Sequence, residues 1–223
     1  MIDVMLGEVV RDYRAALARA LDRLSLEGVR SIAREILAAH DRGGRIYVFG
    51  NGGSAATASH MACDLAKNTC AADAEGVPPL RVHALTDNTA LISALANDLG
   101  YEAIFAEQLR QAPVGARDLA IAISGSGNSP NVLNAVAVAA ASGARTVGLT
   151  GMGGGALASA VDLALIAPSD SMEIIEDLHL VVNHAVTSAI RAALCARGRR
   201  RLILILSVGY VGYWSTRLEG RMV

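Results

Sequence analysis

Three serines and two glycines stand together at residues 124–131, in the order Ser-Gly-Ser-Gly-Asn-Ser-Pro-Asn. An apolar run at 119–123 precedes this stretch, and an alanine-rich helical pattern follows from Pro130. A loop between a strand and a helix start presents unpaired backbone N–H groups and the positive end of the helix dipole, which together stabilise an anion. The serine hydroxyls add donors, so the stretch predicts a phosphate site. The alternative is an ordinary capped turn with Ser129 as the N-cap, which does not need three serines.

Two histidines and several carboxylates form a second set of reactive side chains, on two expected helices. His60 and Asp64 are four residues apart on the helix that follows a second glycine loop, so they share one face of it. Polar groups on the last expected helix also fall within an arc of roughly 100°: Glu173, Glu176, Asp177 and His184. Because the rest of that helix is mostly apolar, this polar stripe requires either solvent or a polar cavity beside it.

Convergence of the two helices would bring together His60, Asp64, Glu176 and His184. Two imidazoles and two carboxylates are a ligand set suited to zinc or a similar divalent ion. Without a metal, the same residues still supply a carboxylate base and an imidazole acid. The spacing alone leaves a solvated surface, a metal site and an acid–base pair open.

The elements expected to position these residues alternate between strand and helix. Five short apolar runs are interpreted as strands, at 45–49, 81–85, 119–123, 145–149 and 162–167. Their alternation with helical patterns predicts an α/β fold, a three-layer α/β/α sandwich with a five-stranded parallel sheet. Ligands bind such sheets outside the carboxyl ends of the strands, where both glycine loops lie. Helical spacing at 4–24 and 25–40 predicts an N-terminal helical hairpin in front of the sheet.

Local signals also predict where two helices begin or end. The pair Thr86-Asp87 is expected to cap a helix that runs through Ala96. The last helix is expected to run from about Met172 to Ala196, so that residues 1–196 form a single domain.

Residues 197–223 form a tail that is first basic and then apolar. The apolar part, 202–214, is shorter than the about 20 residues that a membrane-spanning helix needs. An extra strand, an oligomer contact, a disordered extension and a membrane-surface contact remain open for this tail, and no membrane partner is expected.

The composition limits the partners and the compartment. The 223 residues carry a net charge of −1, which gives no general attraction to nucleic acid or to anionic membranes. No apolar segment after a basic start indicates a signal peptide. The three cysteines, Cys63, Cys70 and Cys195, lack zinc-type spacing and fit a reducing compartment, so the protein is predicted to be cytoplasmic.

Six segments taken together resemble the sugar isomerase (SIS) fold and, more narrowly, the sedoheptulose 7-phosphate isomerases, also called phosphoheptose isomerases. They occur in unbroken order at 49–56 (followed by His60), 85–87, 96–98, 124–132, 148–155 and 176–184. The resemblance covers about residues 5–196 and implies a homotetramer with active sites at subunit interfaces. It also implies conversion of sedoheptulose 7-phosphate into D-glycero-D-manno-heptose 7-phosphate through an enediol.

The resemblance further implies roles for individual residues. The phosphate would be bound by Ser124, Gly125, Ser126 and Ser129. The sugar would be held by Asn51, Gly52, Gly53, Ser54 and Asp98, with further contacts from Glu173 and Glu176. Asp64 and His184 would form the acid–base pair, and zinc would be held by His60, Asp64, Glu176 and His184.

Two positions depart from the family pattern. Asp64 stands where the family usually has a glutamate, and its side chain is shorter by roughly 1.5 Å. Glu176 stands where the family usually has a glutamine, and it adds a negative charge to the site. These departures keep two other functions open: a non-catalytic adaptor that binds a phosphosugar or a replication initiator, and an isomerase for a different sugar phosphate.

Overall fold

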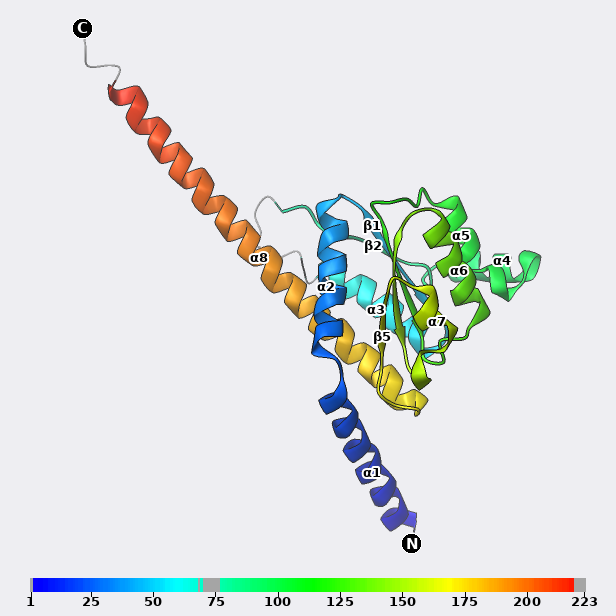
Figure 1. The fold of residues 1–223 in the computed structure, drawn as a ribbon. Helices are drawn as coiled ribbons and strands as arrows, with labels where there is room; N and C mark the ends of the chain where they lie inside the picture. Colours follow the sequence, from blue (N-terminus) through cyan, green and yellow to red (C-terminus); the bar gives the residue numbers. More distant parts are fainter. Residues whose placement is uncertain (1, 68, 70–76, 219–223) are drawn as a thin grey trace.

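The computed structural model of the chain describes residues 2–67, 69 and 77–218, and for residues 199–218 it describes only the backbone. Cys70 and most of the connection expected between the helix at 55–67 and the next strand lie outside the described residues. Five parallel strands form one sheet in the order β2-β1-β3-β4-β5 (Figure 1). The strands are β1 Arg45–Gly50, β2 Arg81–Ala84, β3 Leu119–Ser124, β4 Arg145–Thr150 and β5 Leu163–Ile166.

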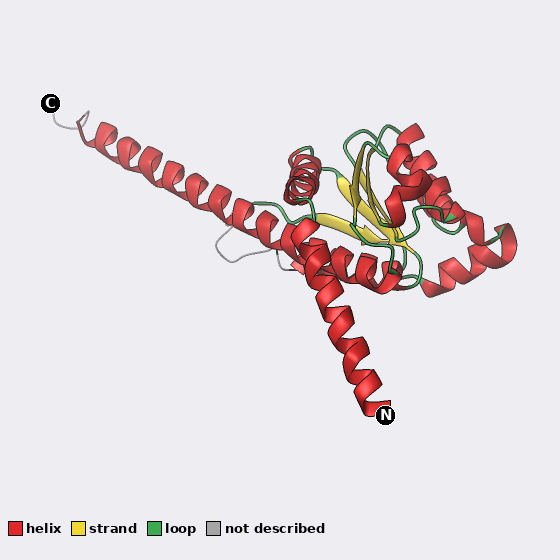
Figure 2. Cartoon of the chain, turned by 60° about the horizontal axis from the view of Figure 1, so that its bottom comes forward, coloured by secondary structure: helices red, strands yellow, loops and turns green. Residues whose placement is uncertain are grey.

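Helices cover both faces of this sheet (Figure 2). One face packs against α2 Leu26–Asp41, α3 Gly53–Lys67 and α8 Met172–Leu218. The other face packs against α4 Thr89–Leu99, α5 Ala106–Gln111, α6 Pro130–Ala141 and α7 Gly155–Ala160, with short 3-10 turns η1 Tyr101–Ala103 and η2 Met152–Gly154. The predicted three-layer α/β sandwich with a five-stranded parallel sheet is therefore confirmed.

The core explains why the strands are continuous apolar runs rather than alternating ones. Successive side chains of a strand point to opposite faces of the sheet. In β1, Ile46 and Val48 belong to the cluster under α2, α3 and α8, whereas Tyr47 and Phe49 belong to the cluster under the helices of the other face. A parallel sheet that is covered on both faces requires apolar side chains at every position.

The two N-terminal helices are present, but α1, Ile2–Arg23, extends away from the body instead of folding back along α2 (Figure 1). Ser25 is the N-cap of α2, as predicted, and its hydroxyl accepts the N–H of Gly28 at 3.0 Å. Near the body, the hydroxyl of Tyr13 donates to Asp177 of α8 at 2.6 Å. This hydrogen bond raises the pKa of Tyr13 to about 12.

The predicted cap of α4 is wrong. The N-cap is Asn88, whose side chain accepts the N–H of Leu91 at 3.0 Å. Thr86 and Asp87 are instead both hydrogen-bonded to the hydroxyl of Ser59 on α3. The pair therefore joins the start of α4 to α3, a tertiary contact that a local capping signal cannot reveal.

The last helix continues beyond its predicted end at residue 196. Its backbone is helical as far as Leu218, so the described part of the tail forms no extra strand. The stretch Met172–Gly198 is long and apolar enough to cross a membrane by length and composition, but 44% of its 18-residue apolar window is buried inside the protein. This stretch is the core helix of the α2–α3–α8 face, because Val182, Val186 and Ile190 are fully buried there.

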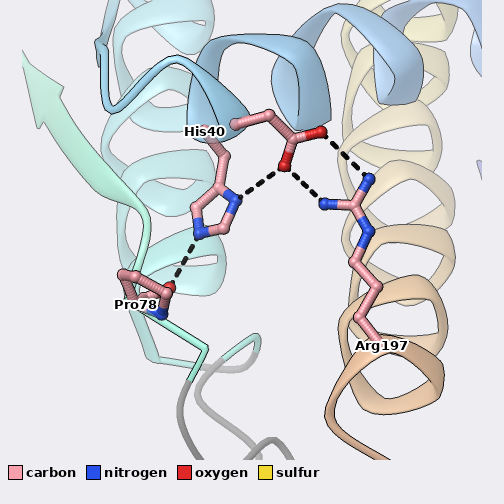
Figure 3. A network of polar contacts seen from close by, with 4 residues as sticks. His40, Pro78 and Arg197 are labelled. Atoms are coloured by element: carbon pink, nitrogen blue, oxygen red, sulfur yellow. Dashed lines mark hydrogen bonds and ion pairs between the residues drawn. The ribbon is translucent and has the colours of Figure 1, made fainter. Parts of the chain in front are cut away.

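A polar network fixes α8 where the tail begins (Figure 3). Arg197 donates to both carboxylate oxygens of Asp41, at 2.6 and 3.1 Å. His40 lies between this carboxylate and the backbone oxygen of Pro78, which is 2.8 Å from its Nε2. Burial alone would raise the pKa of Asp41, but the hydrogen bonds from Arg197 and His40 outweigh it and lower that pKa. Arg197 is therefore tied to the α/β body rather than free of it.

Candidate functional site

The two glycine loops lie next to each other at the carboxyl ends of β1 and β3. The first, at 51–52, leads into α3, and the second, at 125–129, leads into α6. The strands before them are hydrogen-bonded neighbours, with Gly50 paired to Ile123. Strand β2 lies on one side of β1 and β3 on the other, so the strand order reverses at this edge. Open α/β sheets bind ligands at such a switch point.

Three of the predicted reactive side chains come together between α3 and α8: His60, Asp64 and His184. Oδ2 of Asp64 lies 3.3 Å from Nε2 of His60 and 3.7 Å from Nε2 of His184. The two Nε2 atoms are 3.4 Å apart, and the rings meet edge to face. One carboxylate and two imidazoles thus face a common point, a set that suits proton transfer and can also hold a divalent ion.

The carboxylate of this group is buried, whereas its two imidazoles are exposed to solvent. The Asp64 side chain is 11% exposed, whereas the side chains of His60 and His184 are 44% and 53% exposed. Asn183, which is buried, donates its amide N–H to Oδ2 of Asp64 at 3.0 Å. The sequence analysis gives Asn183 no role. Its position next to His184 in a mostly apolar helix is the feature that could have identified it as part of the site.

His179 lies one turn before Asn183 and is also buried. Its Nε2 is 3.2 Å from the backbone oxygen of Thr150 at the end of β4. Burial lowers the pKa of His179 to about 4, even though the contact with Thr150 acts in the opposite direction. The ring is therefore neutral at pH 7 and fastens α8 to the sheet.

Glu176, the fourth expected metal ligand, does not fall within this group. It precedes His184 by eight residues, about 12 Å along the helix axis. Its carboxylate instead lies against the Cα of Gly53 at the start of α3, in the space that a Cβ would occupy. Glycine at position 53 therefore makes room for Glu176, and the carboxylate belongs to the first glycine loop.

The serine loop places its hydroxyls around the start of α6. The Oγ atoms of Ser124 and Ser129 are 3.2 Å apart, and Ser126 accepts the backbone N–H of Asn128 at 3.2 Å. Ser129 occupies the N-cap position, as predicted, but its side chain makes no capping hydrogen bond. Its hydroxyl is thus turned toward the loop rather than the helix, as a ligand contact requires.

Two glycines give the serine loop its shape. Gly127 has a φ of +67°, and a Cβ there would collide with the backbone of Gly154. A Cβ at Gly125 would collide with the sulfur of Met172, the first residue of α8. The start of the long helix therefore lies directly over the loop.

A pair of asparagines joins the two glycine loops. Asn51 donates to Oδ1 of Asn131 at 2.9 Å, and Asn131 donates back to Oδ1 of Asn51 at 2.8 Å. Oδ1 of Asn51 also accepts the hydroxyl of Tyr101 at 3.0 Å. The N–H and the oxygen of the Asn51 amide are thus both used in hydrogen bonds within the protein. The sequence analysis assigns Asn51 to the sugar and does not identify Asn131 or Tyr101.

The other predicted sugar contacts are spread around this edge. Ser54 is buried in the first turn of α3, and Gly52 is exposed with a φ of +54°. Asp98 is exposed near the end of α4 and accepts the amide of Asn97. Glu173 is exposed on α8, and the hydroxyl of Ser171 donates to it and lowers its pKa. In the described part of the chain, neither Asp98 nor Glu173 contacts the group formed by His60, Asp64 and His184.

Comparison with known proteins places this geometry in a family. A family model for the SIS domain matches residues 11–151. A phosphoheptose isomerase from Solidesulfovibrio magneticus is 40% identical over 181 residues, which cover 81% of this chain and 85% of that protein. A phosphoheptose isomerase from Bradyrhizobium sp. strain BTAi1 is 34% identical over 192 residues, 86% of this chain and 94% of that protein.

Two solved structures share the fold closely. Phosphoheptose isomerase GmhA from Neisseria gonorrhoeae has a TM-score of 0.76 at 30% identity, covering 84% of this chain and 99% of its own. A phosphoheptose isomerase from Francisella tularensis also has a TM-score of 0.76, at 28% identity, covering 86% of this chain and 99% of its own. Nearly all of each relative is matched, so this chain carries residues that neither has.

Proposed function

The chain belongs to the SIS-domain family and matches its phosphoheptose isomerases over most of their length, and we propose that it converts sedoheptulose 7-phosphate into D-glycero-D-manno-heptose 7-phosphate. This reaction makes it an aldose–ketose isomerase. The observation that carries the assignment is the convergence of His60, Asp64 and His184 between α3 and α8, in a chain that also carries the serine loop at the carboxyl end of β3.

The serine loop binds the phosphate group in this proposal. Ser124, Ser126 and Ser129 offer hydroxyl donors, and the start of α6 adds backbone N–H groups and the positive end of its dipole. Gly125 belongs to the same loop, and its missing side chain leaves room for Met172 at the start of α8. Binding of the unreactive phosphate end fixes where the carbonyl end of the sugar lies, which is how remote contacts lower the barrier.

Asp64 and His184 move the protons. Isomerisation of the ketose removes a proton from C1 and places a proton on C2, while the oxygens on these carbons exchange their roles as hydroxyl and carbonyl. The Asp64 carboxylate takes the proton from C1, and the His184 imidazole supplies and accepts protons at the two oxygens. The amide of Asn183 orients the carboxylate through its 3.0 Å hydrogen bond to Oδ2.

The donor set also fits a divalent ion, which we infer to be zinc. The ligand atoms of His60, Asp64 and His184 lie within 4.8 Å of one another, and two imidazoles with a carboxylate match the ligand preference of zinc. Such an ion would polarise the carbonyl group and stabilise negative charge on its oxygen. Glu176 acts in this proposal on the sugar side, next to Gly53.

The site is completed by a second copy of the chain. His60 and His184 are about half exposed, although a reaction through an enediol requires shielding from water. The outer part of α1 also exposes apolar side chains, among them Val9 at 61% and Val10 at 68%. Exposed apolar surface of this kind is typical of an oligomer contact. We therefore infer a homotetramer with shared sites, located in the cytoplasm, where unpaired thiols such as that of Cys63 stay reduced.

The test is an NMR time course with sedoheptulose 7-phosphate in deuterated water, with zinc and with a chelator. We expect the aldose to appear with deuterium at C2, because the base exchanges its proton with solvent before returning it. Chelation should slow the reaction, and zinc should restore it. The Asp64→Asn variant keeps the shape of the side chain and should lose at least about 100-fold in rate. No turnover of this ketose by the wild type under either condition would refute the proposed substrate.

A further inference from the structure

Three arginines gather at the opposite end of the strands from the two glycine loops. Arg45 and Arg81 are the first residues of β1 and β2, and they pair in register on neighbouring parallel strands. Their side chains therefore leave the same face of the sheet at adjacent positions. Arg117 precedes β3, and the three arginines line one cavity of about 370 Å³ together with Gly115 and Asp118.

Among the residues that the structure describes, no ion pair neutralises the positive charges in this cavity. None of the ion pairs between described residues includes Arg45, Arg81 or Arg117. Within the described part of the chain, one carboxylate lines the cavity, that of Asp118, which is buried. Its two oxygens accept backbone N–H groups, from Arg45 at 2.7 Å and from Gly115 at 2.9 Å. Three arginines and one carboxylate thus line the cavity, and both oxygens of that carboxylate already accept backbone N–H groups.

Charge and shape together indicate what would occupy the cavity. Like charges directly opposite each other on neighbouring strands destabilise a sheet, so an anion between them contributes stability. A guanidinium group is planar and presents paired donors that match phosphate oxygens. The volume lies near the lower end of the range for small-molecule sites. One phosphate group cannot make bidentate contacts with three guanidinium groups at once.

We propose that this arginine cavity is a second phosphate-binding site, separate from the serine loop, and that it binds the diphosphate group of a small metabolite. Strand β3, Leu119–Ser124, lies between the two sites, because Arg117 and Asp118 precede it and the serine loop begins at its last residue. At about 3.3 Å per residue, this separation is roughly 17 Å. One ligand of small size therefore cannot fill both sites, and the inference does not depend on which sugar the catalytic site converts.

The test is a calorimetric titration of the full chain with inorganic pyrophosphate at about 0.15 M salt, where diffuse charge attraction is screened. We expect two binding events per chain in the wild type, one at the serine loop and one at the arginine cavity. The double variant Arg81→Gln with Arg117→Gln should weaken one event at least about tenfold, because it removes two charge-assisted contacts. It should still convert the sugar phosphate, since neither arginine belongs to the catalytic machinery.

Three further variants separate the possible outcomes. Ser124→Ala with Ser126→Ala should abolish the other event and keep the one at the arginines. Arg81→Lys keeps the charge but loses the planar fork, so it should weaken binding less than Arg81→Gln. Arg30→Gln changes an exposed arginine on α2 and should have no effect. The proposal is overturned if the double arginine variant titrates like the wild type, if Arg30→Gln causes the same loss, or if the serine variant binds no pyrophosphate.

Discussion

Replacement of Asn131 by alanine tests whether the two glycine loops act as one unit. The side chain is 2% exposed and lies at the start of α6. It exchanges two hydrogen bonds with Asn51 and also accepts the backbone N–H of Val132 at 3.0 Å. No other polar contact between described side chains joins the loop after β1 to the loop after β3, so the variant disconnects them.

The size of the effect follows from these three hydrogen bonds. A hydrogen bond contributes about 1 kcal/mol net, and a buried donor left without a partner adds a further penalty. Asn131→Ala removes all three and leaves the amide N–H of Asn51 without its acceptor, whereas the N–H of Val132 still donates to the backbone oxygen of Ser129 at 3.1 Å. We expect the free energy of unfolding to fall by about 3 kcal/mol. We also expect kcat/KM to fall by at least about tenfold, because small misplacements of binding groups slow a reaction strongly.

The measurement is urea unfolding at one fixed protein concentration, together with steady-state kinetics on sedoheptulose 7-phosphate. Asn134→Ala is the matched control, because Asn134 is an exposed asparagine on the same helix with one hydrogen bond, to the backbone of Glu102. This control should lose less than about 1 kcal/mol and keep its kinetic constants. A double-mutant cycle of Asn51→Ala with Asn131→Ala should give a coupling of about 1–3 kcal/mol. Additive effects of the two changes would show that the loops are independent and would refute the reasoning.

Three further perturbations have defined outcomes. The pKa of His179 is about 4 in the folded protein, against an ordinary value of 6.5. Between these two pH values, therefore, the imidazole of His179 takes up a proton only in the unfolded chain. Lowering the pH through this window should cost about 2 kcal/mol of stability in the wild type and less in His179→Gln, measured by urea unfolding at pH 7 and pH 4.5. Asp64→Glu restores the usual family residue and should change kcat by about tenfold or more in steady-state assays, because the carboxylate moves by roughly 1.5 Å. Truncation after Gly198 keeps the ion pair between Arg197 and Asp41, so turnover should stay within about twofold of the full chain.

Much of the fold could be predicted because its signals are local. Each strand is a short apolar run, and each site loop is a glycine and serine stretch between a strand and a helix. Such patterns depend on residues that are neighbours in sequence, as the cap of α2 by Ser25 illustrates. The cap of α4 was mispredicted because Thr86 and Asp87 are engaged by Ser59, which lies 27 and 28 residues earlier.

The asparagine pair could not be predicted for a similar reason. Asn51 and Asn131 are 80 residues apart, and each alone is an ordinary turn residue. Their contact exists because β1 and β3 are neighbours in the sheet, an arrangement that follows from the strand order rather than from either loop. The same neighbourhood brings Tyr101 to Asn51 from the turn after α4.

Glu176 shows which part of the site a helical projection can and cannot predict. The projection gives the direction in which each side chain leaves the helix, and it correctly places Glu176 and His184 on the side that faces α3. It does not give the height along the axis, where the two residues differ by about 12 Å. Helices α3 and α8 run in the same direction, since Gly53 faces Glu176 whereas Asp64, later in α3, faces Asn183, later in α8. The proposed acid–base chemistry therefore lies at the level of His184, and the carboxylate of Glu176 lies two turns away beside the first glycine loop. Its negative charge should act on the hydroxyl groups of the sugar, and hence on which sugar binds, rather than on an ion that His60, Asp64 and His184 would hold.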